Sequence, residues 1–317
     1  MVAMLTLGEA LGVAATTPGE PLGTGSAMRF STAGAEATVA IGMSRLGHTA
    51  VWVGVVGDDE VGRCVIRDLR REGVNADLVR VTGDATTGFM LRDHRTPDHV
   101  GVSYYRTGSA GAQLCGHDVD AAFHRTGDIG LVHLTGITPM LSGAARGAVH
   151  RALELARERA ATVSLDVNYR RALGDTSAAR AELEAMLPYV DILFIGEDEL
   201  FLLTHETEPE NAARFMVTLG PREVVVKLGE RGAYALDADG ATAREDGLPV
   251  TVIDVIGAGD SFAAGYLAAW SENRPLTERL RWANACAACT VGTRGDWEGL
   301  PSRAELPMRA QVGAIIR

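Results

Sequence analysis

Long apolar runs are absent from this sequence of 317 residues. A helix that crosses a membrane needs roughly 20 consecutive apolar residues, and no stretch approaches that length. The amino-terminal segment Met1–Glu9 also lacks the basic start and the long apolar core of a signal peptide, and it favours a short buried strand. We therefore predict a cytoplasmic protein with no membrane partner.

Basic side chains are too few and too scattered to hold a nucleic acid. The chain has 30 Lys and Arg residues against 41 Asp and Glu, its formal net charge is -11, and no Lys/Arg-rich block stands out. Because the phosphate backbone of a nucleic acid is bound chiefly by clustered basic side chains, we predict no nucleic-acid partner. The composition, 46% hydrophobic and 22% charged, is typical of a globular protein that folds around its own core.

Cysteine is scarce as well, with four residues: Cys64, Cys115, Cys286 and Cys289. The last two form a Cys-Ala-Ala-Cys sequence, which suits either a redox pair or half of a zinc site. No second Cys or His pair follows at the spacing of zinc ligands, however. We interpret the pair as small packing residues on a helix, and we predict no direct metal site.

The second half of the chain alternates predicted strands and helices, which is typical of parallel βαβ units in an α/β protein. The predicted strands read as nearly continuous apolar runs, as parallel strands that are buried on both faces should. They are Leu131–Leu134, Val163–Asp166, Asp191–Ile195 and Val224–Lys227. The predicted helices are Arg146–Arg159, Thr176–Leu187 and Asn211–Leu219.

Two stretches in the first half predict a β-hairpin that belongs to a small sheet apart from the core. They are Gly88–Arg92 and Val100–Tyr105, and His94–His99 between them supplies turn-forming residues. No internal repeat or low-complexity linker divides the chain. We therefore expect residues 1–317 to form a single domain.

The strongest motif is a glycine turn between an expected apolar strand that starts at Val250 and an expected helix that runs to Trp270. The turn, Gly257-Ala258-Gly259, would expose backbone N–H groups at the start of the helix. There the helix dipole adds positive potential. This arrangement predicts an anion hole that suits a phosphoryl group.

Asp260 follows this turn, and the sequence around it matches neither of the two common phosphate-binding motifs. A dinucleotide fingerprint would have a third glycine where Phe262 stands, and a Walker loop would continue with Gly-Lys-Ser or Gly-Lys-Thr. A carboxylate beside an anion hole is costly unless it has a task, such as accepting the proton of an attacking hydroxyl. The alternative is that Asp260 only caps its helix.

These residues resemble the ribokinase-like carbohydrate kinases, also known as the phosphofructokinase-B type. Asp254–Phe262 is similar to the carboxy-terminal signature of that family, and Ala33–Gly47 is similar to its amino-terminal signature. The resemblance extends over essentially the whole chain. Tyr104–Ala110, His133–Pro139 and Asp166–Arg170 further resemble the members that act on 2-keto-3-deoxygluconate.

The resemblance implies a Rossmann-type core, in which helices flank a parallel sheet, together with a small β-sheet lid. The lid strands would come from about residues 10–35 and 86–106.

The resemblance also implies cofactors, an assembly and a reaction. ATP and Mg²⁺ are the implied cofactors, and a homodimer or higher homo-oligomer is the implied assembly. Whether a monovalent cation is needed stays open. The implied reaction is ATP-dependent phosphorylation of the terminal hydroxyl of 2-keto-3-deoxygluconate. Another keto-sugar acid, fructose or a nucleoside is the alternative substrate, and a non-catalytic sugar or nucleotide sensor is the alternative of another class.

The resemblance also implies roles for single residues. Asp260 would be the catalytic base, with Gly257, Ala258 and Gly259 as the anion hole. The implied nucleotide-binding residues are Lys227, Gly229, Gly232 and Asn284, and Glu199 would order a water molecule bound to magnesium. The alternatives are that Lys227 is a strand-end lysine that reaches solvent, and that Glu199 is a solvated helix charge.

The implied substrate-binding residues are Gly34, Thr38, Met90, Tyr104, Arg106, Ile137, Asn168, Arg170 and Asp296. Two arginines favour an anionic substrate, because the planar guanidinium fits a carboxylate or a phosphate. Tyr104 and Tyr105 point to opposite faces of a strand, so only one of them can face the ligand. The resemblance selects Tyr104.

Four positions depart from the family pattern. Ala33 takes the place of one glycine of a pair, Thr38 that of an asparagine that binds substrate, Met90 that of a lid tyrosine, and Gly196 that of an asparagine before Glu199. A threonine offers one hydroxyl where an amide offers a donor and an acceptor. Three of the four lie toward the substrate, so these departures bear on the identity of the sugar and leave the kinase prediction in place.

Overall fold

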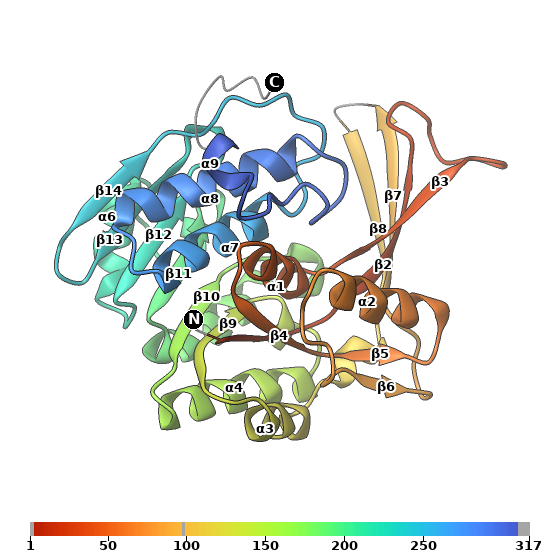
Figure 1. The fold of residues 1–317 in the computed structure, drawn as a ribbon, viewed down its shortest axis with the longest axis horizontal. Helices are drawn as coiled ribbons and strands as arrows, with labels where there is room; N and C mark the ends of the chain where they lie inside the picture. The colour runs from red at the N-terminus through yellow and green to blue at the C-terminus, as the bar shows by residue number, and fades with distance from the viewer. Residues whose placement is uncertain (1–2, 97–98, 310–317) are drawn as a thin grey trace.

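The computed structural model describes residues 3–96 and 99–309, in which helices cover both faces of a large mixed sheet (Figure 1). Within these residues the main sheet has eight strands, in the order β14-β13-β12-β11-β10-β9-β1-β4. The strands from β12 to β4 run parallel, whereas β13 and β14 are antiparallel additions at one edge. The bounds are β1 (Ala3–Leu7), β4 (Thr49–Val53), β9 (Ile129–Thr135), β10 (Thr162–Asp166), β11 (Ile192–Gly196), β12 (Glu223–Lys227), β13 (Ala233–Asp237) and β14 (Thr242–Glu245).

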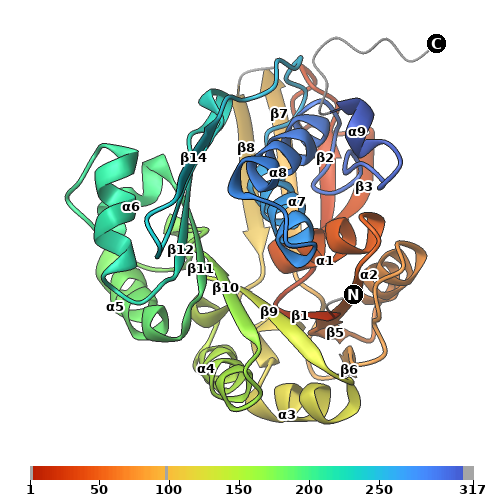
Figure 2. The same cartoon turned by 60° about the vertical axis from the view of Figure 1, so that its left-hand side comes forward.

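Two groups of helices bury the two faces of this sheet (Figure 2). One face carries α1 (Ala35–Arg45), α2 (Glu60–Arg71), α7 (Ala258–Ser271), α8 (Leu276–Val291) and α9 (Leu306–Arg309). The other carries α3 (Gly116–Arg125), α4 (Gly143–Glu158), α5 (Thr176–Met186) and α6 (Pro209–Val217). Successive strand residues alternate between the two apolar cores: Leu193 and Ile195 face α4 to α6, while Ile192 and Phe194 face α7. The predicted α/β fold is confirmed.

The four strands predicted between Leu131 and Lys227 and the three helices predicted among them are present, and their ends differ from the prediction by three residues or fewer. The apolar strand expected from Val250 is wrong. No strand lies between β14 and α7, and Val252 and Ile253 are 63% and 50% exposed. The N–H groups of Ile253 and Asp254 donate hydrogen bonds to the carbonyl of Val291 at the end of α8 instead of to a neighbouring strand.

Within the described residues, four strands form a second sheet beside the main one (Figure 1), which we call the small sheet. Its order is β3-β2-β7-β8, with β2 (Leu11–Thr16), β3 (Met28–Ala33), β7 (Phe89–Thr96) and β8 (His99–Tyr105). The predicted hairpin is therefore confirmed as β7 and β8, which pair antiparallel. Pro97 and Asp98 of its turn lie outside the described residues. A separate two-stranded sheet joins β5 (Val55–Gly57) to β6 (Arg80–Thr82).

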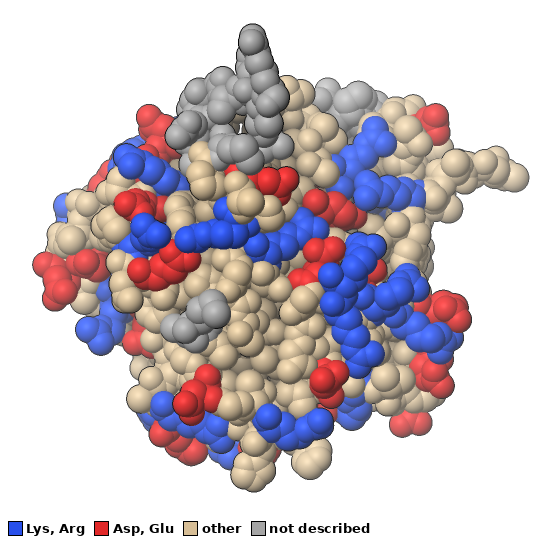
Figure 3. All heavy atoms as spheres, in the orientation of Figure 1, with Lys and Arg blue, Asp and Glu red and all other residues tan. Residues whose placement is uncertain are grey.

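The surface mixes charges of both signs. Figure 3 shows Lys and Arg side chains interspersed with Asp and Glu over the face that it draws. Surface ion pairs add little to stability, so the two apolar cores carry most of it. In the described part of the chain, no helix combines the length and the apolar character that crossing a bilayer demands.

The contact between α7 and α8 depends on a glycine, and this generates a stability prediction. A Cβ on Gly265 would lie 2.7 Å from the carbonyl oxygen of Trp282 and 2.9 Å from Sγ of Cys286. We expect Gly265→Ala to lower the free energy of unfolding by about 1–3 kcal/mol, because α8 must move away. The matched control is Gly147→Ala on the exposed side of α4, where nothing lies within 4 Å. It should raise stability by about 0.4–1 kcal/mol. Urea unfolding measures both changes, and equal effects would contradict the prediction.

Candidate active site

A cavity of about 510 Å³ lies at the carboxyl ends of the parallel strands. Its lining includes one residue shortly after each of five strands: Glu9 after β1, Ile137 after β9, Asn168 after β10, Glu199 after β11 and Gly229 after β12. The carboxyl ends of parallel strands meet at one edge of a sheet, where α/β proteins bind their ligands. The topology therefore gathers side chains that are far apart in the sequence.

The small sheet supplies the opposite wall of the cavity. Leu11 of β2, Met90 of β7 and Tyr104 of β8 line it, and Met90 is the cross-strand partner of Tyr104. Tyr105 points elsewhere and is 63% exposed. Arg106 follows β8 and also lines the cavity, with its guanidinium against the ring of Tyr104.

The glycine turn before α7 forms the floor beside Asp260. Gly257 is the N-cap of α7 and has a φ of 76°, in the left-handed region that favours glycine. A Cβ there would also overlap the backbone of Asp296. A Cβ on Gly259 would lie 3.4 Å from Nζ of Lys227, so this ammonium adds positive charge beside the turn. Backbone N–H groups, helix dipole and lysine together favour an anion here.

Asp260 lies in the first turn of α7 and is 7% exposed. Its Oδ1 accepts a hydrogen bond of 2.7 Å from Nδ2 of Asn168. Burial raises the pKa of Asp260 to about 7; the Asp166 carboxylate adds to the rise, whereas Arg170 and Lys227 oppose it. A carboxyl group with a pKa near the working pH is suited to accept and release a proton.

A buried ion pair joins β10 to β12 below this turn. Nζ of Lys227 lies 2.7 Å and 2.8 Å from the two carboxylate oxygens of Asp166, which is fully buried. Burial lowers the pKa of Lys227, but the carboxylates of Asp166 and Glu199 outweigh burial, so that the pKa is raised. The ammonium stays charged and faces the cavity.

Glu199 is held by the backbone of two neighbouring segments. Its Oε1 accepts the N–H of Tyr169 at 2.6 Å, and its Oε2 accepts the N–H of Gly196 at 2.7 Å. Burial raises the pKa of Glu199, and the charge of Lys227 opposes the rise. At 9% exposure, Glu199 is a fixed part of the cavity wall.

A second cavity of about 440 Å³ is lined by Arg244–Leu248, Arg281 and Asn284. Nδ2 of Asn284 donates a hydrogen bond of 3.0 Å to the carbonyl of Asp246. The turn from Gly229 to Gly232 connects the two cavities: Gly229 lines the first, and Gly232 lies against the backbone of the segment that lines the second.

Most of the predicted site residues therefore lie together. The first cavity is lined by Gly34, Met90, Tyr104, Arg106, Ile137, Asn168, Arg170, Glu199, Lys227, Gly229, Gly257, Gly259, Asp260 and Asp296. Its lining does not include Thr38, Ala258, Gly232 or Asn284. Thr38 is fully buried in α1, and its Oγ1 has no hydrogen-bond partner among the described residues.

Sequence reasoning missed three carboxylates that line the cavity: Glu9, Glu36 and Asp198. Glu9 contacts both Arg106 and Ser109. Glu36 accepts hydrogen bonds of 2.6 Å from the hydroxyls of Thr135 and Thr138, and burial raises its pKa. The signal for Glu9 was its place directly after a buried strand; Glu36 stood inside the recognised signature.

The Cys-Ala-Ala-Cys sequence lies outside these cavities. Cys286 is buried in α8, where it meets Gly265 of α7, and burial raises the pKa of its thiol. Among residues 3–96 and 99–309, no three Cys, His, Asp or Glu side chains are grouped so that they could hold a metal ion.

Residues 4–303 match the family described as pfkB family carbohydrate kinase. The chain belongs to the pfkB family of carbohydrate kinases. It is 38% identical over 310 residues to the 2-dehydro-3-deoxygluconokinase of Thermoproteus tenax, covering 96% of this chain and 93% of that relative. The crystal structure of a PfkB protein from Polaromonas sp. JS666 is 32% identical and has a TM-score of 0.86, covering 97% and 99% of the two chains.

A third relative was crystallised with a nucleotide. The E. coli protein described as Ribokinase II, in complex with ATP and Mg²⁺, is 26% identical and has a TM-score of 0.88, covering 98% of this chain and 99% of that one. The predicted ribokinase-like fold and the predicted carbohydrate-kinase activity are confirmed. ATP dependence follows from membership of this kinase family.

The raised pKa of Asp260 can be measured directly. In ¹³C NMR of labelled Asp carboxyl groups, the signal that Asp260→Asn removes should titrate near pH 7. In Asp296→Asn the midpoint should move to lower pH, because the negative charge of Asp296 raises the pKa of Asp260. The surface variant Asp239→Asn serves as control and should leave the midpoint unchanged. A midpoint near pH 4 in the unsubstituted protein would contradict the buried, charge-coupled carboxyl group.

Proposed function

We propose that this pfkB-family kinase transfers the terminal phosphoryl group of ATP to the terminal hydroxyl of 2-keto-3-deoxygluconate. The observation that carries the proposal is the buried carboxyl group of Asp260, with a pKa of about 7, beside the glycine turn and Lys227. The name of the Thermoproteus tenax relative, 2-dehydro-3-deoxygluconokinase, supports the substrate, which is the same compound under another name.

In the proposed reaction, Asp260 accepts the proton of the attacking hydroxyl while Asn168 orients its carboxylate. The new P–O bond forms to the substrate oxygen, and the bond to the ADP oxygen breaks. Backbone N–H groups of Gly257, Ala258 and Gly259 stabilise the charge on the transferred phosphoryl group.

The nucleotide would extend from this turn along Lys227, Gly229 and Gly232 into the second cavity, where Asn284 lies. The carboxylate of Glu199 fits a magnesium-bound water, because each oxygen accepts one backbone N–H and keeps a further lone pair. Bound Mg²⁺ would neutralise part of the phosphate charge of ATP.

Two arginines line the proposed substrate side of the cavity, and they differ in exposure and in ion pairing. Arg106 is 12% exposed at its side chain and is paired with Glu9, so its guanidinium is oriented and its charge is largely balanced. Arg170 is exposed to the cavity, and no ion pair to it occurs within the described part of the chain. We propose that Arg170 supplies the unbalanced charge for the carboxylate of the substrate or for the transferred phosphoryl group.

The proposed substrate wall is completed by Gly34, Tyr104, Ile137 and Asp296, and Met90 adds an apolar surface to it. Thr38 would act on this wall only through the packing of α1. We further propose that the small sheet, with strands from about residues 10–35 and 86–106, is a lid of the single domain. The cytoplasmic location and the homodimer or higher homo-oligomer stay predictions. The need for a monovalent cation stays open.

A substrate panel with purified protein, ATP and Mg²⁺ tests the proposal, with ADP release as the readout. We expect kcat/KM for 2-keto-3-deoxygluconate to exceed that for fructose or a nucleoside by on the order of a hundredfold or more, because a missing carboxylate leaves the guanidinium without its partner. Including the C4 epimer of the sugar acid separates recognition of the carboxylate from recognition of the hydroxyls. Turnover of a neutral sugar without turnover of either acid would overturn the substrate.

Two neighbouring arginines provide a matched pair within this panel. Arg170→Gln should raise KM for the acid strongly and change the turnover of fructose little if Arg170 binds the carboxylate. If Arg170 binds the transferred phosphoryl group instead, kcat should fall for every substrate. Arg171→Gln is the control, because Arg171 is exposed and does not line the cavity.

The role of Asp260 predicts a pH dependence. The base must be unprotonated, and its raised pKa means that this form predominates only above about pH 7. We therefore expect kcat/KM to fall about tenfold per unit as pH drops below 7. Asp260→Asn should lower kcat by roughly 10²–10⁴-fold, while ATP still binds in equilibrium dialysis. Turnover that survives this substitution would refute a base at this position.

A further inference from the structure

Arg92 lies in β7 of the small sheet, and its buried side chain extends to the loops before α7 and after α8. Its side chain is 2% exposed. Nη1 lies 3.3 Å from Oδ2 of Asp254, and Nη2 contacts Oδ1 of Asp296. The two carboxylates belong to loops 162 and 204 residues away in the sequence. A planar guanidinium can bond to two such groups at once, as a lysine ammonium cannot in the same geometry.

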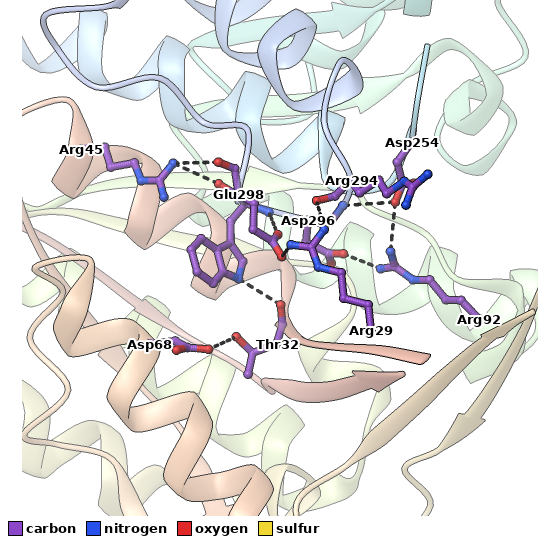
Figure 4. Close-up of polar contacts among 11 residues, drawn as sticks. Arg29, Thr32, Arg45, Asp68, Arg92, Asp254, Arg294, Asp296 and Glu298 are labelled. Carbon is purple, nitrogen blue, oxygen red and sulfur yellow. Dashed lines mark hydrogen bonds and ion pairs between the residues drawn. The ribbon is translucent and has the colours of Figure 1, made fainter. Parts of the chain in front are cut away.

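Asp254 ties the two loops to each other as well as to Arg92 (Figure 4). Its Oδ1 accepts the N–H of Ile256 at 3.1 Å, directly before the glycine turn. Its Oδ2 accepts the N–H of Gly295 at 3.3 Å, in the segment that follows α8. Arg92 therefore bonds to a carboxylate that sets the path of the chain into the turn.

Asp296 supports the same turn from its other side. Its backbone lies so close to Gly257 that a Cβ on the glycine would overlap it. Its side chain lines the cavity beside Asp260. Through Asp254 and Asp296, Arg92 thus contacts both the approach to the turn and the backbone that packs on it.

A second strand of the small sheet contacts the same segment (Figure 4). Nη2 of Arg29 in β3 lies 3.1 Å from Oε1 of Glu298, and Nε1 of Trp297 donates a hydrogen bond of 3.0 Å to the carbonyl of Thr32. Arg29 is exposed, however, whereas Arg92 is buried. The buried contact is the one whose loss would leave carboxylates uncompensated.

We propose that Arg92 is a positioning residue that couples the small sheet to the phosphoryl-transfer turn. The inference rests on the proposed kinase reaction. The small sheet lines the substrate side of the cavity, and its position decides whether the guanidinium reaches Asp254 and Asp296. With Arg92 in place, the turn from Ile256 to Gly259 keeps the shape that receives the phosphoryl group.

Kinetics of Arg92→Ala in the full-length protein test this coupling. We expect kcat to fall on the order of a hundredfold, because a small displacement of the reacting groups costs that much, while KM for ATP stays nearly unchanged. The matched control is Arg95→Ala on the same strand, whose side chain is 69% exposed and, among the described residues, forms an ion pair with Asp93 alone. It should retain the turnover of the unsubstituted enzyme.

Chemical rescue distinguishes positioning from general support of the fold. Ethylguanidinium should restore a large part of kcat in Arg92→Ala and have no effect on Arg95→Ala, because it can occupy the space between the two carboxylates. Arg92→Lys keeps the buried charge but not the fork, so its kcat should lie between those of the alanine variant and the unsubstituted enzyme. The lysine variant keeps the test valid if the alanine variant does not fold.

The outcomes separate this inference from the proposed function. If the unsubstituted enzyme phosphorylates no sugar acid of the panel, the proposed function fails. If it does, and Arg92→Lys and any folded Arg92→Ala turn over normally, the coupling is refuted. A folded Arg92→Ala that is inactive and does not respond to ethylguanidinium also refutes it. Reduced kcat with rescue supports it.

Discussion

The buried ion pair between Lys227 and Asp166 sets the charge balance on which the rest of the cavity depends. It joins β10 to β12 across β11, and it places an ammonium beside Gly259 where carboxylates would otherwise dominate. Lys227 lowers the pKa of both Glu199 and Asp260, while Asp166 raises them. Removing either partner would leave a buried charge uncompensated, at a cost of about 3–5 kcal/mol. Burial is the main cause of the raised pKa of Asp260, and the two partners of this pair shift that pKa in opposite directions.

The fold brings the two halves of this balance to one place. Parallel strands deliver Asn168, Glu199 and the turn at Gly229 from the main sheet, and the small sheet delivers Met90 and Arg106 from the opposite side. Charged side chains of the small sheet also contact the loops before α7 and after α8. The proposed coupling through Arg92 would make the geometry of the glycine turn depend on the position of the small sheet.

Local patterns carried much of the sequence prediction. The alternating strands and helices of the second half are encoded by apolar runs that are buried on both faces, and the turn at Gly257–Gly259 is encoded by glycine itself. The same reasoning failed at Val250–Asp254, because an apolar stretch becomes a strand only beside a partner strand. The edge strands of the main sheet are β14 and β4, and this segment pairs with neither of them. Asparagine at 168 was recognised through resemblance, but its hydrogen bond to Asp260 spans 92 residues.

The sequence by itself determined the α/β class, the family signatures and the identity of the carboxylate in the glycine turn, because each is written in residues that are neighbours along the chain. Only the tertiary structure decided that Glu9 balances Arg106 and that Arg92 reaches Asp254 and Asp296. These outcomes depend on burial and on pairings between distant segments. A pKa near 7 at Asp260 likewise arises from desolvation and from charges on other strands, which no local pattern records.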